Sequence, residues 1–396
     1  MKIRPSLVLL ELLIMMVYLN PVADLFPSAI QIVVFVLWAF AISFEGDILN
    51  RGIRLSSLSI LIMLVTFVRC VMADQLNMDY YSPFQVVIQR YQFVVYPMIF
   101  IYTNSLKQAE KYKVFKWALL CITGTVLVSL YYVLRIDPQA IRNTQGVNYF
   151  GVGDFQLMYA MSILFGPLLF LLLKKIHEHK RWVWLAIVVL LMAFCLVLCN
   201  LVTSVVIAMV SVTITYILTR RTKLLYVLFA IIIIACLSLR RFFAGLLYAL
   251  AAKNLFYWST NNKIIAIANV LMGSTDNIDT LSRRSMLAGQ SLQSFKENPI
   301  FGIDFKNHVA GKIGCHCQWA DDLGRFGILG NVFIVYNYVR IVKYTIKNSG
   351  EFVKKNMISA WICFFILGFL NPNLSGTILM AILVVIPTFD AVGGDA

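Results

Sequence analysis

Long apolar runs separated by short polar turns make up most of this chain. Each run has roughly 17 to 25 residues, the length that an α-helix needs to cross about 30 Å of hydrocarbon. The runs lie near residues 6–24, 28–44, 55–73, 84–104, 114–134, 155–173, 182–200, 203–219, 224–239, 323–342, 356–371 and 375–392. They lack the alternating pattern of barrel strands. The sequence therefore predicts an all-α fold, a polytopic membrane bundle of about twelve transmembrane helices.

One long polar interruption, residues 240–322, separates the ninth and tenth predicted helices. No internal repeat or linker divides the chain, so we expect one integral membrane domain over residues 1–396 with this segment inserted as a large loop. Within the loop, residues 281–297 predict a helix. Its apolar seam is formed by Leu281, Ala288, Leu292 and Phe295. Ser282 is the expected N-cap, and Pro299 marks the expected end.

Lysine and arginine are concentrated in alternate turns between the runs. Examples from these basic turns are Arg51, Lys113, Lys174, Arg220 and Lys347. The turns between them hold aspartate or no charge. Cationic turns are retained on the cytoplasmic side of a membrane. We therefore expect both termini in the cytoplasm and the loop of residues 240–322 on the periplasmic or extracellular face.

The composition supports a membrane protein, and the topology explains the positive net charge. Hydrophobic residues make up 60% of the 396 residues and charged residues only 13%, far from the balance of a soluble globular chain. The formal net charge is +15, and most of it lies in the basic turns. The charge is thus a signal of topology, so we expect membrane lipids as partners and no nucleic acid.

Most of the eight cysteines lie inside predicted spans, where cysteine acts as a small apolar residue. Cys315 and Cys317 differ because they flank His316 in the predicted outer loop. A zinc site needs about four ligands, and the other histidine of this loop, His308, has no second cysteine pair near it. We therefore expect neither a metal ion nor another cofactor.

Several arginines are candidate binding groups for an anionic substrate. Arg283 and Arg284 follow the expected N-cap, where free backbone N–H groups and guanidinium groups together make an anion site. Arg90 lies inside the fourth predicted span, where an unpaired cation is costly. We expect it to face a polar cavity, with a buried ion pair to Asp154 or a side chain reaching the interface as alternatives. Arg142, in the loop before the sixth span, is a further candidate.

A patterned run connects these arginines with the tenth span. It consists of Arg284, Ala288, Phe295, Pro299, Phe301, Gly302, Phe305, His316, Gly327 and Gly330. The run resembles the signature region of the O-antigen polymerase and ligase superfamily. In that family an external arginine, a Pro-Leu-Phe-Gly-like turn, a histidine and a final pair of glycines follow one another. Cys317 and Arg325 depart from the pattern common in ligases, which favours a Wzy-type polysaccharide polymerase.

The resemblance implies a metal-independent glycosyltransferase with polyprenyl-diphosphate-linked glycans as donor and acceptor, and the residues suit that chemistry. The leaving diphosphate develops negative charge, which arginine stabilises with paired hydrogen bonds. The attacking sugar hydroxyl needs a base, and an imidazole exchanges protons near neutral pH. The candidate catalytic residues are therefore His316 and Arg284. The candidate ligands of the diphosphate or the sugar are Arg283, Arg90, Arg142, Asp321 and Asp322. Either aspartate is also a candidate to orient the imidazole.

We therefore expect an enzyme of the bacterial cytoplasmic (inner) membrane. It would polymerise undecaprenyl-diphosphate-linked repeat units into O-antigen or capsular polysaccharide at the outer leaflet, with a chain-length regulator as a further partner. The alternative within the family is an O-antigen ligase, which shares the fold and residues but transfers glycan to the lipid A core. An alternative of another class is a flippase for the same lipid-linked sugar. Transporters usually have related halves, and none are visible in this sequence.

Overall fold

The structure, a computed structural model, describes residues 4–20, 28–72, 90–138, 155–178, 182–199, 201–220, 240–253, 257–273, 279–303 and 313–393. Every regular element formed by these residues is a helix. The all-α fold is therefore confirmed for this part of the chain. The ninth predicted span, residues 224–239, lies outside it.

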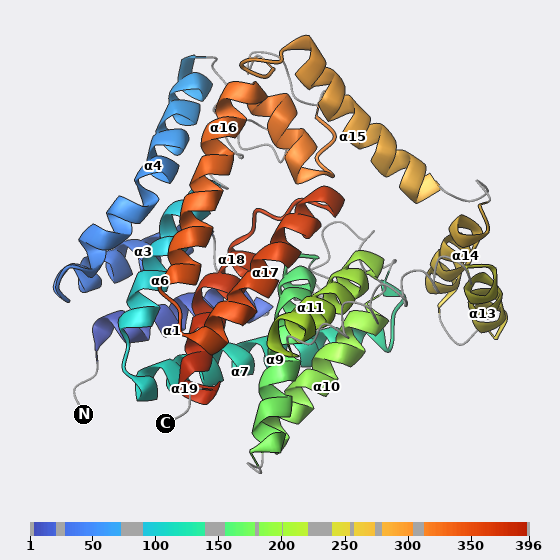
Figure 1. The fold of residues 1–396 in the computed structure, drawn as a ribbon, viewed down its shortest axis with the longest axis horizontal. Coiled ribbons are helices and arrows are strands. Elements are labelled where there is room, and N and C mark those ends of the chain that lie inside the picture. Colours follow the sequence, from blue (N-terminus) through green and yellow to red (C-terminus); the bar gives the residue numbers. More distant parts are fainter. Residues whose placement is uncertain are drawn as a thin grey trace.

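Figure 1 shows the arrangement of the described helices, coloured in chain order. Their bounds are α1 Pro5–Tyr18, α3 Ser28–Ser43, α4 Ile48–Met72, α6 Gln92–Ser105, α7 Gln108–Val133, α9 Phe155–His177, α10 Val183–Leu198, α11 Val202–Arg220, α13 Arg240–Ala252, α14 Trp258–Met272, α15 Asp279–Glu297, α16 Gln318–Lys347, α17 Glu351–Leu370, α18 Gly376–Met380 and α19 Asp390–Gly393. A π-helical turn, Ala381–Val385, and a 3₁₀ turn, Ile386–Phe389, connect α18 to α19.

Six helical segments of the described residues are long and apolar enough to cross a membrane. They are Ile48–Val71, Gln108–Val133, Gln156–His177, Val202–Thr219, Glu351–Leu370 and Gly376–Gly393. The apolar stretches of α1, α3, α10 and α13 are shorter, with 10–17 residues each. The helices thus support a membrane protein, whereas the predicted number of twelve spans stays a prediction.

The core of the bundle is formed by α9 and the C-terminal helical segment. In each of these two segments, 78% of the most apolar window is buried, compared with 28% for α4 and α11. Outward-facing side chains of the peripheral helices are large and apolar, such as Phe40 on α3 and Leu64 on α4. Such surfaces are costly in water and suited to lipid.

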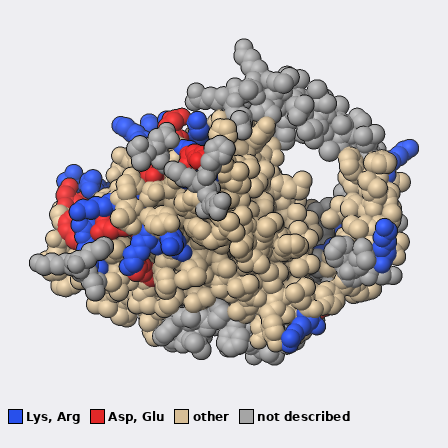
Figure 2. All heavy atoms as spheres, turned by 90° about the horizontal axis from the view of Figure 1, so that it is seen from below, with Lys and Arg blue, Asp and Glu red and all other residues tan. Residues whose placement is uncertain are grey.

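Charged side chains pair at the end of the bundle that carries both termini. Arg4 lies 3.4 Å from Glu110, and Lys111 lies 3.9 Å from Asp390. Figure 2, viewed from this end, shows lysine and arginine side chains gathered together with acidic ones. These contacts join segments that the sequence assigns to the same side of the membrane. The contacts place these segments at one end of the bundle, and the side of the membrane on which this end lies stays a prediction.

The inserted segment contains three of the described helices. α13 and α14 pack on each other, and α15 packs on α16 (Figure 1). The helix predicted over residues 281–297 is confirmed, although it begins at Asp279. α16 begins at Gln318, before the tenth predicted span at residues 323–342, so it includes the last residues of the predicted loop.

Candidate functional site

The turn that follows α15 docks on a kink in α16. Gly327 interrupts α16 with a φ of 61° and a ψ of −168°, so the N–H groups that follow lose their usual carbonyl acceptors. Ile328 N donates to Pro299 O at 2.8 Å. Leu329 N donates to Ile300 O at 3.1 Å. The turn supplies the acceptors that the kink removes, so the two parts of the sequence motif form one structural unit.

Two glycines permit this close approach. Gly302 has a φ of 77° and Gly327 a φ of 61°, both in the left-handed region that glycine adopts readily. A Cβ atom on Gly302 would lie 2.2 Å from the Arg325 carbonyl oxygen. A Cβ atom on Gly327 would lie 2.4 Å from the Ile300 carbonyl oxygen. Any side chain at either position would therefore push the turn away from α16.

Asp321 connects the segment before α16 to α15. Its Oδ1 accepts a hydrogen bond from the buried Ser291 hydroxyl at 2.5 Å and one from Cys315 N at 3.2 Å. The Ser291 hydroxyl in turn accepts from Gly314 N at 2.9 Å. Burial raises the pKa of Asp321, and the Ser291 bond and the nearby Arg325 charge oppose this rise. The carboxylate thus holds the residues around Cys315 in place.

Arg90 and Asp322 form a buried ion pair between the start of α6 and α16. Arg90 Nη2 lies 2.5 Å from Asp322 Oδ1, and the side chains are only 5% and 1% exposed. Arg90 Nη1 also donates to the Tyr338 hydroxyl at 3.1 Å. Gln318 Nε2 donates to Asp322 Oδ1 at 2.9 Å. The structure thus favours the ion-pair alternative for Arg90, with Asp322 as the partner, whereas Asp154 lies outside the described residues.

Unpaired polar atoms remain in this cluster. Within the described part of the chain, Arg90 Nε, Asp322 Oδ2 and Arg325 Nη1 are buried without a hydrogen-bond partner. The cavity lined by Arg90 and Tyr338 has a volume of about 10 Å³, which holds about one water molecule. A diphosphate does not fit this space in the conformation described, so direct substrate contact by Arg90 requires the cluster to open.

The hydrogen bonds around Asp321 and those around the Arg90–Asp322 pair form two buried networks. His316 lies on the surface beside these two networks, between Cys315 and Cys317. Its Nδ1 lies 2.8 Å from the Cys315 carbonyl oxygen. A carbonyl oxygen only accepts, so in the neutral imidazole this contact assigns the hydrogen to Nδ1 and leaves the lone pair on Nε2. The exposed imidazole is therefore set to accept a proton at Nε2. The Cys315 carbonyl, and neither Asp321 nor Asp322, orients the ring.

Arg284 lies at the same end of the bundle as the histidine. Its exposed side chain places Nη1 3.4 Å from Thr203 Oγ1, which accepts from Asn371 Nδ2 at 3.2 Å. Asn371 is the C-cap of α17. The Cys317 thiol lies 3.7 Å from the carbonyl oxygen of Gly368, in the last turn of the same helix. Both candidate catalytic residues therefore lie around the end of α17, beside the start of α16 (Figure 1).

Arg283 and Arg284 do not lie in the first turn of their helix, where the sequence predicted them. Because α15 begins at Asp279, Ser282 is not its N-cap, and the free N–H groups of the first turn precede both arginines. The predicted placement of Arg283 and Arg284 in the first turn, next to these N–H groups, is therefore wrong, whereas anion binding by the two arginines stays a prediction. Arg284 remains an exposed cation. The Arg283 side chain and all of Arg142 lie outside the described part of the structure.

Several residues of the two networks were not predicted from the sequence. Leu292, assigned to the apolar seam of α15, is 42% exposed, whereas Ser291 and Ser294 are buried. The sequence spacing could have indicated the buried face of α15. Small residues recur every three positions and so lie on one face of a helix, namely Ala288, Ser291 and Ser294. Gln318 offered a second signal, since it precedes Asp322 by one helical turn.

The two cysteines beside His316 are half-buried. Burial raises the pKa of both Cys315 and Cys317, which disfavours the thiolate form that binds metals. Within the described residues, no group of three or more histidine, cysteine, aspartate or glutamate side chains is placed to hold a metal ion. Comparisons of the chain with family models, curated proteins and solved structures found no match.

Proposed function

We propose that this chain is a membrane glycosyltransferase that polymerises undecaprenyl-diphosphate-linked oligosaccharide repeat units into O-antigen or capsular polysaccharide. The reaction takes place at the outer leaflet of the bacterial cytoplasmic membrane, with both chain termini in the cytoplasm. The observation that carries the proposal is the hydrogen bond from His316 Nδ1 to the Cys315 carbonyl oxygen at 2.8 Å. It gives an exposed base at the end of the bundle that also carries Arg284.

The proposed step is the attack of a sugar hydroxyl on the anomeric carbon of the lipid-linked donor. His316 Nε2 accepts the hydroxyl proton while the new C–O bond forms. The bond between the anomeric carbon and the diphosphate breaks, and the diphosphate oxygen keeps the electron pair. Arg284 stabilises the charge on this leaving group, because a guanidinium stays protonated and offers paired donors to phosphate oxygens. Arg283 and Arg142 are proposed as further contacts to the diphosphate.

The two buried networks support this reaction by fixing the segment that carries the base. Asp321 holds Cys315 N at 3.2 Å, and the Cys315 carbonyl orients His316. Asp322 anchors the first turns of α16 to Arg90. A base that is displaced by about 1 Å loses much of its effect. We therefore propose positioning roles for Arg90, Asp321 and Asp322, and sugar binding by the aspartates as their alternative role.

The test is chain extension by the purified protein. The protein in detergent is supplied with lipid-linked repeat units, and the products are separated by size. We expect a ladder of products from the unaltered chain and its loss, by about 10²- to 10⁴-fold in rate, for His316→Ala. Arg284→Ala should also lose the ladder, and Arg284→Lys should recover only part of it because lysine lacks the paired donors.

Matched controls separate these effects from a general loss of protein. His177 and Arg51 are exposed residues elsewhere in the bundle, so His177→Ala and Arg51→Ala should extend chains normally. Full ladders from both His316→Ala and Arg284→Ala would refute the site. Deletion of the gene in the producing cell distinguishes a polymerase from a ligase. A surface glycan of single repeats supports a polymerase, whereas full-length chains left on the lipid carrier indicate a ligase.

A further inference from the structure

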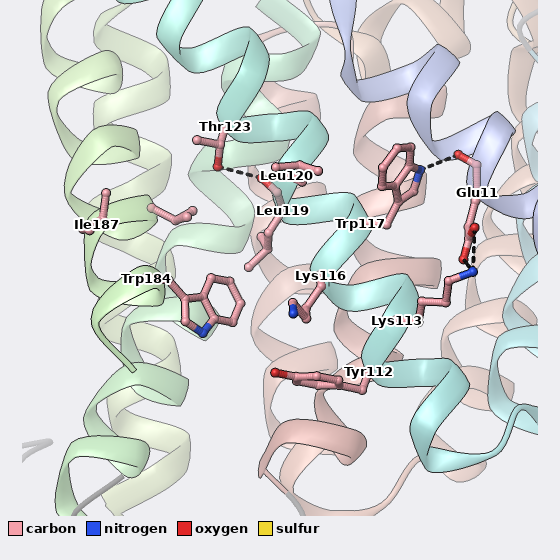
Figure 3. A pocket seen from close by; sticks show the side chains of 11 residues that line it. Glu11, Tyr112, Lys113, Lys116, Trp117, Leu119, Leu120, Thr123, Trp184 and Ile187 are labelled. Atoms are coloured by element: carbon pink, nitrogen blue, oxygen red, sulfur yellow. Dashed lines mark hydrogen bonds and ion pairs between the residues drawn. The ribbon is translucent and has the colours of Figure 1, made fainter. Parts of the chain in front are cut away.

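A groove lies between α7 and α10 (Figure 3). Its lining residues are distant in the sequence from His316 and Arg284. Its volume is about 750 Å³, and its lining residues come from α1, α7 and α10. This volume falls in the range of about 300–1,000 Å³ that is typical of sites for small molecules. The groove therefore has room for an ordered ligand.

The charge of the groove is unbalanced. Lys113 lies 2.8 Å from Glu11 Oε1, so these two side chains neutralise each other. Lys116 is exposed and points toward the α10 side of α7 (Figure 3). Its Nζ lies 5.5 Å from the centre of the Tyr112 ring, and among the described residues no carboxylate pairs with it. The groove thus presents one free cation, bordered by Tyr112 and Trp184.

The polarity of the groove changes along its length. Lys116 lies near the polar end, and one helical turn further on the groove is lined by Leu120 and then by Thr123. Leu120 is 62% exposed, and Ile187 on the facing helix is 51% exposed. A cation with aromatic neighbours at one end and open apolar walls beyond it matches an amphiphile with an anionic head and a hydrocarbon tail.

We propose that this groove binds an anionic phospholipid. The headgroup phosphate contacts Lys116 beside Tyr112 and Trp184, and an acyl chain lies along Leu120 and Ile187. A lipid suits the site better than a soluble anion does, because the apolar walls are open on the surface of a chain whose helices are apolar enough for a membrane. The predicted topology places this lipid in the cytoplasmic leaflet, opposite the proposed reaction.

The test is lipid retention measured by native mass spectrometry on the full chain in detergent. The protein is mixed with phosphatidylglycerol or with phosphatidylcholine of the same acyl chains. We expect phosphatidylglycerol to bind about fivefold more tightly, the effect of one lysine near an anionic headgroup. Lys116→Gln should remove this preference. Leu120→Trp, which places a larger side chain in the groove, should weaken the binding of both lipids.

Lys343→Gln is the matched control, because Lys343 is also an exposed lysine and the change removes the same charge. It should keep the preference for phosphatidylglycerol. Equal binding of the two lipids by the unaltered chain would overturn the proposal, and so would equal losses from Lys116→Gln and Lys343→Gln. Displacement of the lipid by millimolar inorganic phosphate would also overturn it, since the ligand would then be a free anion. Chain extension is not needed for any of these measurements.

Discussion

Arg90 Nη2 and Asp322 Oδ1 lie 2.5 Å apart, joining residues that are 232 positions apart in the chain. The pair connects the start of α6 to the first turns of α16, immediately after the segment that carries His316. Its two side chains are buried, so each charge depends on the other for its stability. The pair therefore couples the packing of the bundle to the place of the proposed base.

Arg90→Met leaves the Asp322 carboxylate buried without its cation. We expect a loss of about 3–5 kcal/mol in the free energy of unfolding, because an uncompensated buried charge is strongly destabilising. The double variant Arg90→Met with Asp322→Leu should recover most of this loss. Thermal unfolding in detergent compares the unaltered chain, Arg90→Met, Asp322→Leu and the double variant. If the double variant lost as much as the sum of both single variants, the two residues would not be coupled.

The same double variant distinguishes positioning from substrate binding. If Arg90 acts through α16 alone, the recovered protein should extend chains with the same apparent affinity for the donor. A folded double variant with a much weaker affinity for the donor would instead assign substrate contact to Arg90 or Asp322.

The described helices outside residues 240–322 could be predicted in their order, because apolar runs of sufficient length are strong local signals, whereas α13 and α14 inside the inserted segment were not predicted. The predicted helix boundaries were less accurate where polar residues form the first turn of a helix. α16 begins at Gln318 rather than near 323, since Asp321 and Asp322 are paired inside the protein. The hydropathy pattern treats such residues as loop, whereas their partners make them compatible with burial.

The sequence predicted the residues of the motif in the candidate site, but not the contacts between residues that are distant in the chain. The glycines and the turn of the motif could be found from the sequence, and they meet at Gly327. The partner of Arg90 could not, because a contact over 232 positions depends on the packing of whole helices. The same holds for Ser291, whose partner Asp321 lies on the next helix.

Gly302→Ala and Gly327→Ala should separate the turn from the kink in α16. A Cβ atom at these positions would lie 2.2 Å and 2.4 Å from backbone oxygens, and alanine resists a positive φ. We expect a loss of about 1–3 kcal/mol or more in the free energy of unfolding for each change. Thermal unfolding measures the loss, and chain extension should fall with it.

Gly289 in α15 provides the control for both glycine changes. No atom lies within 4 Å of a Cβ built there, and the residue is in the interior of a helix. Gly289→Ala should therefore stabilise the protein by about 0.5–1 kcal/mol. Destabilisation by Gly289→Ala equal to that of Gly302→Ala would contradict the proposed docking geometry.

Asp321 should make stability depend on pH in a defined direction. Burial raises its pKa above 3.8 in the folded protein, so the folded state binds more protons than the unfolded state between the two values. The free energy of unfolding should therefore fall as pH rises from about 4 through the raised pKa, and this contribution should be constant above it. Asp321→Asn should remove this component, whereas Asp47→Asn, at an exposed aspartate, should keep it. A steeper fall in Asp321→Asn would contradict the prediction.

The reactivity of Cys315 tests the environment of His316 directly. Burial raises the pKa of the Cys315 thiol, and Arg325, whose Nη2 lies 3.4 Å from the sulfur, opposes the rise. Because the thiolate is the reactive form, we expect alkylation by iodoacetamide to be slow at neutral pH and to accelerate above pH 9. Arg325→Gln should slow the labelling of Cys315 further, by about two- to tenfold. Timed labelling followed by peptide mass spectrometry measures each cysteine separately.

Cys317 serves as the internal control in the same protein. Burial also raises its pKa, but Arg325 is not among the groups that influence it, so its labelling rate should not change in Arg325→Gln. Arg325→Lys should restore the rate at Cys315 because the cation is kept. Faster labelling of both cysteines would mean that the segment before α16 has opened. Faster labelling of Cys315 alone would show that Arg325 shields the sulfur from the reagent rather than favouring its thiolate.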